Sequence, residues 1–335
     1  MISIAYPESS TNRDLFKTRY YDVIKLNINL TGINSELNHI IFKGSTLDFE
    51  KLAKAEFDEL ILITQLINTH FSVISIARKT KFYTQFDYDK LQPIIANFFI
   101  KHSNIPLSSC FYCEIDYINF FKNIGDYSDP IDFINRANKE ELMSVKNIGE
   151  VKAKKIIDYR NINPILQLSE LEFASSITNE LYKFDKQSGS NHFTLDHFLP
   201  QKDYPYLSLS LFNFVPSCYS CNSKFKKAKN FSSLNNTKYI SPTSLYYSLN
   251  EDLKFKIFYK NNLLNIKTSK DYTLRTDVLN NKDIVLEYMN LFKIGGRYAF
   301  HKESITALIK KKNNYSDSKI KEISRLITSC NLLTV

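Results

Sequence analysis

Tryptophan is absent from this chain of 335 residues, and glycine is scarce, with only seven residues. None of these glycines forms a G-x-G-x-x-G or a G-x-x-x-x-G-K-[ST] pattern. The chain therefore lacks the backbone cradles that hold dinucleotides and nucleotide phosphates, which disfavours both classes of enzyme. Hydrophobic residues make up 43% of the sequence, enough to form globular cores, and the length suits two or three domains.

Long apolar segments are also missing. The longest apolar run, near residues 60–67, is far too short to cross a bilayer. Residues 1–17 show no basic start followed by an apolar segment, so no secretory signal is expected. These observations predict a soluble, cytoplasmic protein with no membrane partner.

The charge of the chain is unbalanced towards basic residues. Lys and Arg number 44 against 35 Asp and Glu, which gives a net charge of +9. A basic balance favours polyanionic partners such as nucleic acid. A coding bias towards Lys and Asn would produce the same excess, so charge alone does not decide the matter.

Four of the five cysteines form two Cys-x-x-Cys pairs, Cys110 with Cys113 and Cys218 with Cys221. In a cytoplasmic chain such pairs point to metal binding rather than disulfides, and four thiolates suit one structural Zn²⁺. The pairs are separated by 104 residues, which a self-contained inserted module would explain. Two unrelated metal knuckles, simply buried cysteines or a redox pair are the alternatives.

The first 105 residues are expected to form a mainly helical region. Apolar spacing predicts one helix over 46–71, capped by Asp48 or Thr46, and another over 88–102 with Pro93 near its first turn. No catalytic grouping occurs here, so a helical scaffold is the expectation. Residues 106–125 then carry the first half of the zinc site.

Residues 126–186 are predicted to form the insert. The sequence indicates a helix capped at Asn135 or Asn138, a turn at 147–149 and a second helix over 150–160. Its Glu-Glu-Leu, Ile-Gly, Lys-Ala and Ile-Ile-x-Tyr-Arg pattern resembles the helix-hairpin-helix module of bacterial competence DNA receptors, and 166–184 looks like a degraded second hairpin. The resemblance implies contact with the DNA backbone through Lys146, Asn147, Gly149 and Lys152. A purely structural helix pair is the alternative.

Residues 187–235 contain the densest motif of the chain. Asp196 and His197 are adjacent, Asn213 follows His197 by sixteen residues and Asn222 by twenty-five. An alternating segment at 193–197, a second apolar stretch over 206–215 and a basic segment after Cys218 predict a strand, loop, strand and helix. A carboxylate and an amide are ligands that suit a hard divalent cation, and an imidazole can deprotonate water.

This pattern resembles the catalytic core of HNH endonucleases of the ββα-metal type. The resemblance implies that His197 is the general base, that Asp196 and Asn222 hold a catalytic Mg²⁺ or Mn²⁺, and that Asn213 orients the loop. The third family position is often His, and here it is Asn222. Basic residues after this position are expected to meet DNA phosphates: Lys224, Lys226, Lys227 and Lys229. His192 is a weaker candidate for supporting the site.

Residues 236–335 are expected to form a mixed or mainly helical C-terminal cap. A β-hairpin is predicted over 253–269 with Asn261 and Asn262 in its turn, followed by helices broken at Gly295 and Gly296. Arg297, Tyr298 and His301 form a polar cluster after this break. It is interpreted as a packing cluster, with contact to DNA or to the catalytic core as the alternative.

The sequence thus predicts an α+β, mainly helical protein with an HNH core, a structural zinc site and an inserted helix-hairpin-helix module. The function expected from these resemblances is metal-dependent cleavage of duplex DNA, in anti-phage defence or restriction and with an ATPase as a possible partner. The alternatives are a non-catalytic, zinc-dependent DNA-binding or targeting subunit and an RNA-cleaving HNH nuclease.

Overall fold

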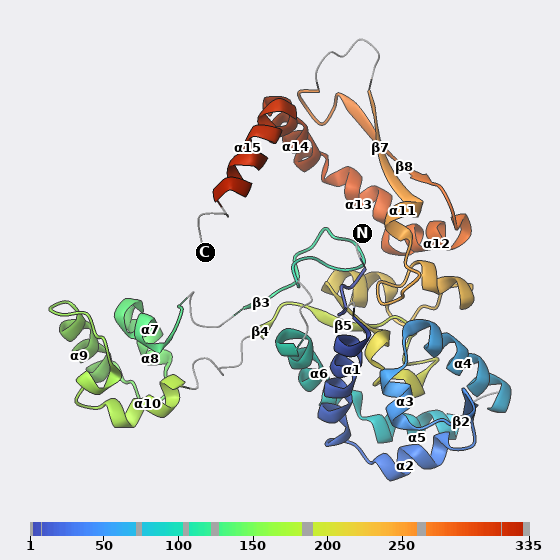
Figure 1. Ribbon diagram of the computed structural model, residues 1–335, viewed down its shortest axis with the longest axis horizontal. Helices are drawn as coiled ribbons and strands as arrows, with labels where there is room; N and C mark the ends of the chain where they lie inside the picture. The colour runs from blue at the N-terminus through green and yellow to red at the C-terminus, as the bar shows by residue number, and fades with distance from the viewer. Residues whose placement is uncertain are drawn as a thin grey trace. The chain divides into compact units, whose positions relative to one another are not determined.

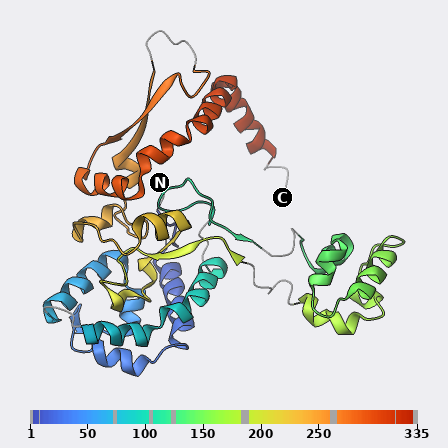
Figure 2. The same cartoon turned by 180° about the vertical axis from the view of Figure 1, so that it is seen from behind.

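The computed structural model describes residues 3–7, 9–71, 76–102, 107–121, 127–182, 190–259, 266–315 and 317–330. The chain divides into two compact units (Figures 1 and 2). The larger unit comprises 1–118 and 193–335, and the smaller unit comprises 119–192. Each unit has its own hydrophobic core.

The N-terminal part of the larger unit is helical apart from one short hairpin, β1–β2. Its elements are α1 (Ser10–Lys25), α2 (Leu30–Leu37), β1 (Ile41–Phe42), β2 (Ser45–Thr46), α3 (Phe49–Lys54), α4 (Phe57–Phe71), α5 (Ile76–Phe86) and α6 (Tyr88–His102). Helix α1 packs beside α3 and α6 (Figure 1). The predicted helix over 88–102 is present, and it includes Pro93.

The single helix predicted over 46–71 is two helices. The Asp48 side chain caps α3 by accepting from the Lys51 amide at 2.8 Å. The chain then turns at Ala55, whose ψ of 131° is not helical, and α4 begins at Phe57. Apolar spacing continues across this break because both helices bury residues in the same core, so the spacing could not reveal it.

The centre of the larger unit is a two-stranded antiparallel sheet followed by a helix. It contains β5 (Thr194–His197), η3 (Pro205–Leu207), η4 (Leu211–Asn213), β6 (Phe214–Ser217), η5 (Ser220–Lys226) and η6 (Asn235–Tyr239). The predicted strand at 193–197 is therefore present. The expected second strand is shorter, because half of 206–215 lies in two 3₁₀ turns and the strand begins only at Phe214. Helix η5 has π-type turns.

The C-terminal part of the larger unit combines a β-hairpin with helices. Its elements are α11 (Leu249–Asp252), β7 (Leu253–Tyr259), β8 (Tyr272–Val278), α12 (Lys282–Phe292), α13 (Ile294–Phe300), α14 (Lys302–Asn314) and α15 (Asp317–Cys330). Strand β8 packs against α12 and α13. The hairpin prediction was too short, since β7 pairs with 272–278, and Asn261 and Asn262 lie outside the described residues.

The predicted helix break at Gly295 and Gly296 is also wrong. Both glycines lie inside α13, and the break occurs at Lys293, which has a φ of +55°. A residue with a left-handed backbone ends an α-helix whichever side chain it carries. The prediction relied on the two glycines and therefore placed the helix break two residues too late in the chain.

The smaller unit is a helical module with its ends held together. It contains β3 (Phe120–Phe121), α7 (Pro130–Arg136), α8 (Lys139–Ser144), α9 (Glu150–Arg160), η1 (Leu168–Glu170), α10 (Ala174–Tyr182) and β4 (Ser190–Asn191). Strands β3 and β4 pair in antiparallel fashion, and the His192 amide donates to the Asn119 carbonyl at 2.7 Å. The chain therefore enters and leaves this unit at one place.

The protein is mostly helical, with small two-stranded sheets, which confirms the coarse fold prediction. Among the described residues, no helix combines the length and the apolar character needed to cross a membrane.

Candidate functional site

The hairpin β5–β6 places Asp196 and His197 at the end of one strand. Asp196 pairs with Val215 and His197 pairs with Phe214. Both polar side chains are almost fully buried, with relative exposures of 4% and 8%. Burial of a charged or titratable group is costly unless the group is paired, so the contacts of these two residues decide their states.

Asp196 has two strong partners. Its Oδ2 accepts a hydrogen bond from the Tyr112 hydroxyl and lies 2.9 Å from Lys226 Nζ. Lys226 also donates to the His197 carbonyl at 2.6 Å. Burial raises the pKa of Asp196, and the contacts with Lys226 and Tyr112 oppose that rise.

Lys226 was expected to meet DNA phosphates, and the structure contradicts this. Its side chain has no solvent exposure. The position falls within a run of lysines, but η5 turns this one towards the strand ends, where it neutralises Asp196. Its neighbours Lys224, Lys227 and Lys229 are exposed.

The His197 ring is fixed by packing and by one hydrogen bond. It lies against Tyr88 and Phe214, with ring centroids 4.4 Å and 5.0 Å away. Its Nε2 is 2.9 Å from the Ser208 carbonyl oxygen. A carbonyl oxygen only accepts, so Nε2 carries the proton and Nδ1 keeps its lone pair. Burial lowers the pKa of His197 to about 4, which makes the ring neutral at neutral pH.

Asn213 closes the loop between the two strands. Its Oδ1 accepts from the Leu199 amide at 2.8 Å, and its Nδ2 donates to the carbonyls of Leu199 and Leu207 at 3.1 Å and 3.3 Å. The side chain is fully buried, and each of these bonds satisfies a backbone group of the loop. The loop that includes the His197 partner Ser208 is thereby held in one shape.

Asn222 lies in the first turn of η5 and is half-buried. Its carbonyl accepts from the Lys227 amide at 2.7 Å, which closes a π-type turn, and Lys227 itself ends the helix with a φ of +51°. Helix η5 packs against β5 and α12. Asn222 precedes Lys226 by four residues, so the two lie on nearly the same side of the helix.

The two Cys-x-x-Cys pairs come together in the larger unit. All four cysteines are buried, and their sulfur atoms lie within 4.8 Å of one another. Two come from the turn at 110–113, which a positive φ at Glu114 closes, and two flank the start of η5. A tetrahedron of thiolates about 2.3 Å from a central ion has this size, so the cluster fits a structural metal such as zinc.

The protonation of the four thiols also favours a cation. Hydrogen bonds from the neighbouring thiols, Cys110 first among them, lower the pKa of Cys113. The pKa values of Cys218 and Cys221 are raised, chiefly by their hydrogen bonds with Cys110 and then with Cys113. A divalent cation at the centre would replace these hydrogen bonds and allow all four thiols to ionise.

Arg297 of α13 contacts the cysteine cluster directly. Its guanidinium donates to Cys221 Sγ at 3.2 Å and to Cys113 Sγ at 3.3 Å, and it pairs with Asp116 at 3.0 Å. The adjacent Tyr298 donates its hydroxyl to the Cys113 carbonyl at 2.8 Å. Arg297 was predicted to belong to a packing cluster, because no motif links a residue 76 positions beyond Cys221 to the metal ligands.

The smaller unit contains the predicted hairpin. Asn138 caps α8 in a capping box with Glu141, and Asn147 adopts a φ of +72°, which Asn tolerates better than most residues. Lys146, Asn147 and Gly149 are exposed. Lys152 is partly engaged within the unit, donating to the Asn147 carbonyl at 2.9 Å and to Ser176 Oγ at 2.8 Å. The region proposed as a second hairpin forms η1 and α10.

Comparison with known proteins identifies one part of the chain. Residues 130–183 match the helix-hairpin-helix motif family, which suggests that this unit binds DNA. No curated protein and no solved structure matches the chain.

Proposed function

We propose that the protein is a metal-dependent DNA endonuclease of the HNH type. The observation that carries this proposal is the hairpin β5–β6 running into η5. Asp196 and His197 lie at the end of the first strand, Asn213 closes the loop and Asn222 lies in the first turn of the helix. The helix-hairpin-helix motif supports DNA as the substrate.

His197 has the state that a general base requires. Its ring is neutral at neutral pH, and the Ser208 carbonyl fixes the proton on Nε2. Nδ1 is then the atom that accepts a proton from water. Packing against Tyr88 and Phe214 prevents the ring from turning away.

Asp196 and Asn222 supply the oxygen donors for a catalytic cation. The contacts of Asp196 with Tyr112 and Lys226 use Oδ2, so Oδ1 is the oxygen that we assign to the ion. Asn222 lies on the side of η5 that carries Lys226, and Lys226 reaches Asp196. Carboxylate and amide oxygens suit Mg²⁺ or Mn²⁺, which would stabilise the charge that develops on the phosphate and on the leaving oxygen.

The remaining parts hold this site and its substrate. A metal in the cysteine cluster would join the turn at 110–113 to η5, and so fix the helix that carries Asn222. Lys224 and Lys227 are exposed beside that residue and are our candidates for phosphate contacts. The smaller unit would hold the DNA backbone through its exposed hairpin turn.

The test is nicking or linearisation of supercoiled plasmid by the purified chain with Mg²⁺ or Mn²⁺. His197→Ala should abolish cleavage while DNA binding remains, whereas His301→Ala, at an exposed histidine, should cleave like the unchanged protein. Duplex DNA, single-stranded DNA and RNA substrates, compared side by side, identify the preferred nucleic acid. Binding without cleavage under every metal would instead favour a non-catalytic targeting subunit.

A further inference from the structure

The two units differ in charge in a way that bears on DNA binding. Of the 44 basic and 35 acidic residues, residues 119–192 contain 10 and 11. The smaller unit therefore has a net charge of −1, although it contains the motif that suggests DNA binding. Neutralisation of phosphates supplies most of nonspecific DNA affinity, so the larger unit must provide most of that charge.

Within the larger unit the excess is concentrated near the C-terminus. Nine basic and three acidic residues lie between Lys293 and Arg325. Most of them are on α14 and α15, which we call the basic arm. Its exposed cations include Lys310, Lys311, Lys312, Lys321 and Arg325.

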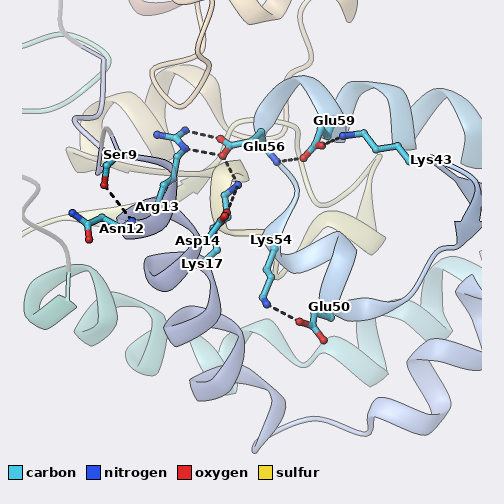
Figure 3. Close-up of polar contacts among 10 residues, drawn as sticks. All are labelled: Ser9, Asn12, Arg13, Asp14, Lys17, Lys43, Glu50, Lys54, Glu56 and Glu59. Carbon is cyan, nitrogen blue, oxygen red and sulfur yellow. Dashed lines mark hydrogen bonds and ion pairs between the residues drawn. The ribbon is translucent and has the colours of Figure 1, made fainter.

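Lysines in the N-terminal part of the larger unit provide a contrast. Figure 3 shows Lys43 paired with Glu59, Lys54 paired with Glu50 at 2.6 Å, and Lys17 bridging to Glu56 at 2.5 Å. These cations are neutralised by their neighbours. Among the ion pairs of the described residues, none uses Lys310, Lys311 or Lys312.

The start of the basic arm is anchored to strand β8. The Tyr272 hydroxyl of β8 donates to the Lys302 carbonyl at 2.7 Å and lies 3.4 Å from Thr306 Oγ1, the buried residue of α14. The Lys302 ammonium lies 4.5 Å from the centre of the Tyr272 ring. Beyond this anchor, residues 307–315 and 317–325 are exposed except Ile309, which is half-buried.

Helix stability does not account for all of the cations on the basic arm. Cations in the last turn of α14 interact favourably with the helix dipole, which gives Lys311 and Lys312 a structural reason to be there. That reason does not extend to Lys321, which lies beyond the first turn of α15 and outside its last turn, where the dipole has little effect.

We propose that the basic arm is a second DNA-binding surface, which contacts phosphates of duplex DNA without reading sequence. The charges of the smaller unit and of the basic arm indicate that the two contribute differently to DNA binding. The smaller unit contacts the backbone through a hairpin turn with little net charge, and the basic arm supplies the ionic, salt-sensitive part of the affinity. The proposal takes its ligand, duplex DNA, from the proposed function.

The test is the salt dependence of binding to a fluorescent duplex, measured by anisotropy with no added Mg²⁺ or Mn²⁺ so that the DNA stays intact. The variant is Lys310→Gln/Lys311→Gln/Lys312→Gln. The matched control is Lys43→Gln/Lys51→Gln/Lys54→Gln, which removes the same charge from lysines that are already paired. Each lost phosphate contact reduces the slope of log K against log salt by about 0.9, so the arm variant should lose about 2 to 3 in slope. The control should keep the slope of the unchanged protein.

Equal slopes for the arm variant and the control would overturn the proposal. So would a change of oligomeric state in the arm variant alone, measured by light scattering, because the arm would then be a self-association surface. The nuclease proposal can fail independently of the proposal for the basic arm. This would be the result if the unchanged protein did not cleave plasmid but the salt slopes of the arm variant and the control still differed. If the full chain does not bind duplex DNA, the proposal for the basic arm is wrong as well.

Discussion

At the scale of single residues, the most informative contact is the buried pair of Lys226 and Asp196. The adjacent Asp and His were visible in the sequence, and so was a run of lysines after Cys221. Nothing in the sequence separated Lys226 from Lys224 or Lys227, because the turn geometry of η5 decides which lysine faces inwards. An α-helix and a π-helix direct the same residue to different sides.

Lys226→Met should destabilise the larger unit by about 3 to 5 kcal/mol, because it leaves the Asp196 carboxylate buried beside a partner that no longer carries charge. Urea unfolding, followed by circular dichroism, measures this. Lys224→Met changes the same residue type at an exposed position and should stay within about 0.5 kcal/mol of the unchanged protein. Similar losses for the two variants would show that the pair does not stabilise the fold.

At the scale of elements, the sequence predicted what local chemistry determines. The strand at 194–197, the capping box at Asn138, the positive φ at Asn147 and the helix over 150–160 are present. The predictions that were wrong concern features that tertiary packing determines. The helix break that was expected at the glycines occurs at Lys293, and β7 pairs with a strand that begins 13 residues after β7 ends. The gathering of the cysteines was predictable from their spacing, but the approach of α13 was not.

Arg297→Gln should weaken metal retention by the cysteine cluster. The guanidinium donates to two sulfurs and carries a positive charge beside thiolates, and loss of such an outer contact costs about 10-fold to 100-fold in metal affinity. The measurement is release of Zn²⁺ to a coloured chelator from the loaded protein. Arg275→Gln, at an exposed arginine of β8, is the control. Equal release from both variants would mean that Arg297 only packs against the site.

At the scale of the whole molecule, two hydrophobic cores divide the chain. One is built from α1–α6, the central hairpin and α12, and the other lies within 133–181. The cysteine cluster belongs entirely to the larger unit. Apolar periodicity indicates which residues are buried but not which core receives them, so the sequence predicted the insert from its motif rather than from its packing.

Calorimetry should resolve two unfolding transitions, one for each unit. Removal of the metal by a chelator, or Cys113→Ser, should lower the transition of the larger unit by about 10 °C, because structural zinc contributes several kcal/mol and about 1 kcal/mol shifts a large domain by about 2 to 4 °C. The transition of the smaller unit should not move. One transition that shifts as a whole would contradict the separation of the cores.

The pairing of Asn119 with His192 has a consequence for how such a protein can arise and change. A stretch of DNA that encodes a module with adjoining ends can be gained, lost or exchanged in one recombination event. Without the module, a short turn would be enough to rejoin the two segments of the larger unit. Cys113 and Cys218 would keep their places through such an event. The helix-hairpin-helix module could therefore be replaced during evolution, or by design, while the cysteine cluster and the strand ending in His197 are inherited unchanged.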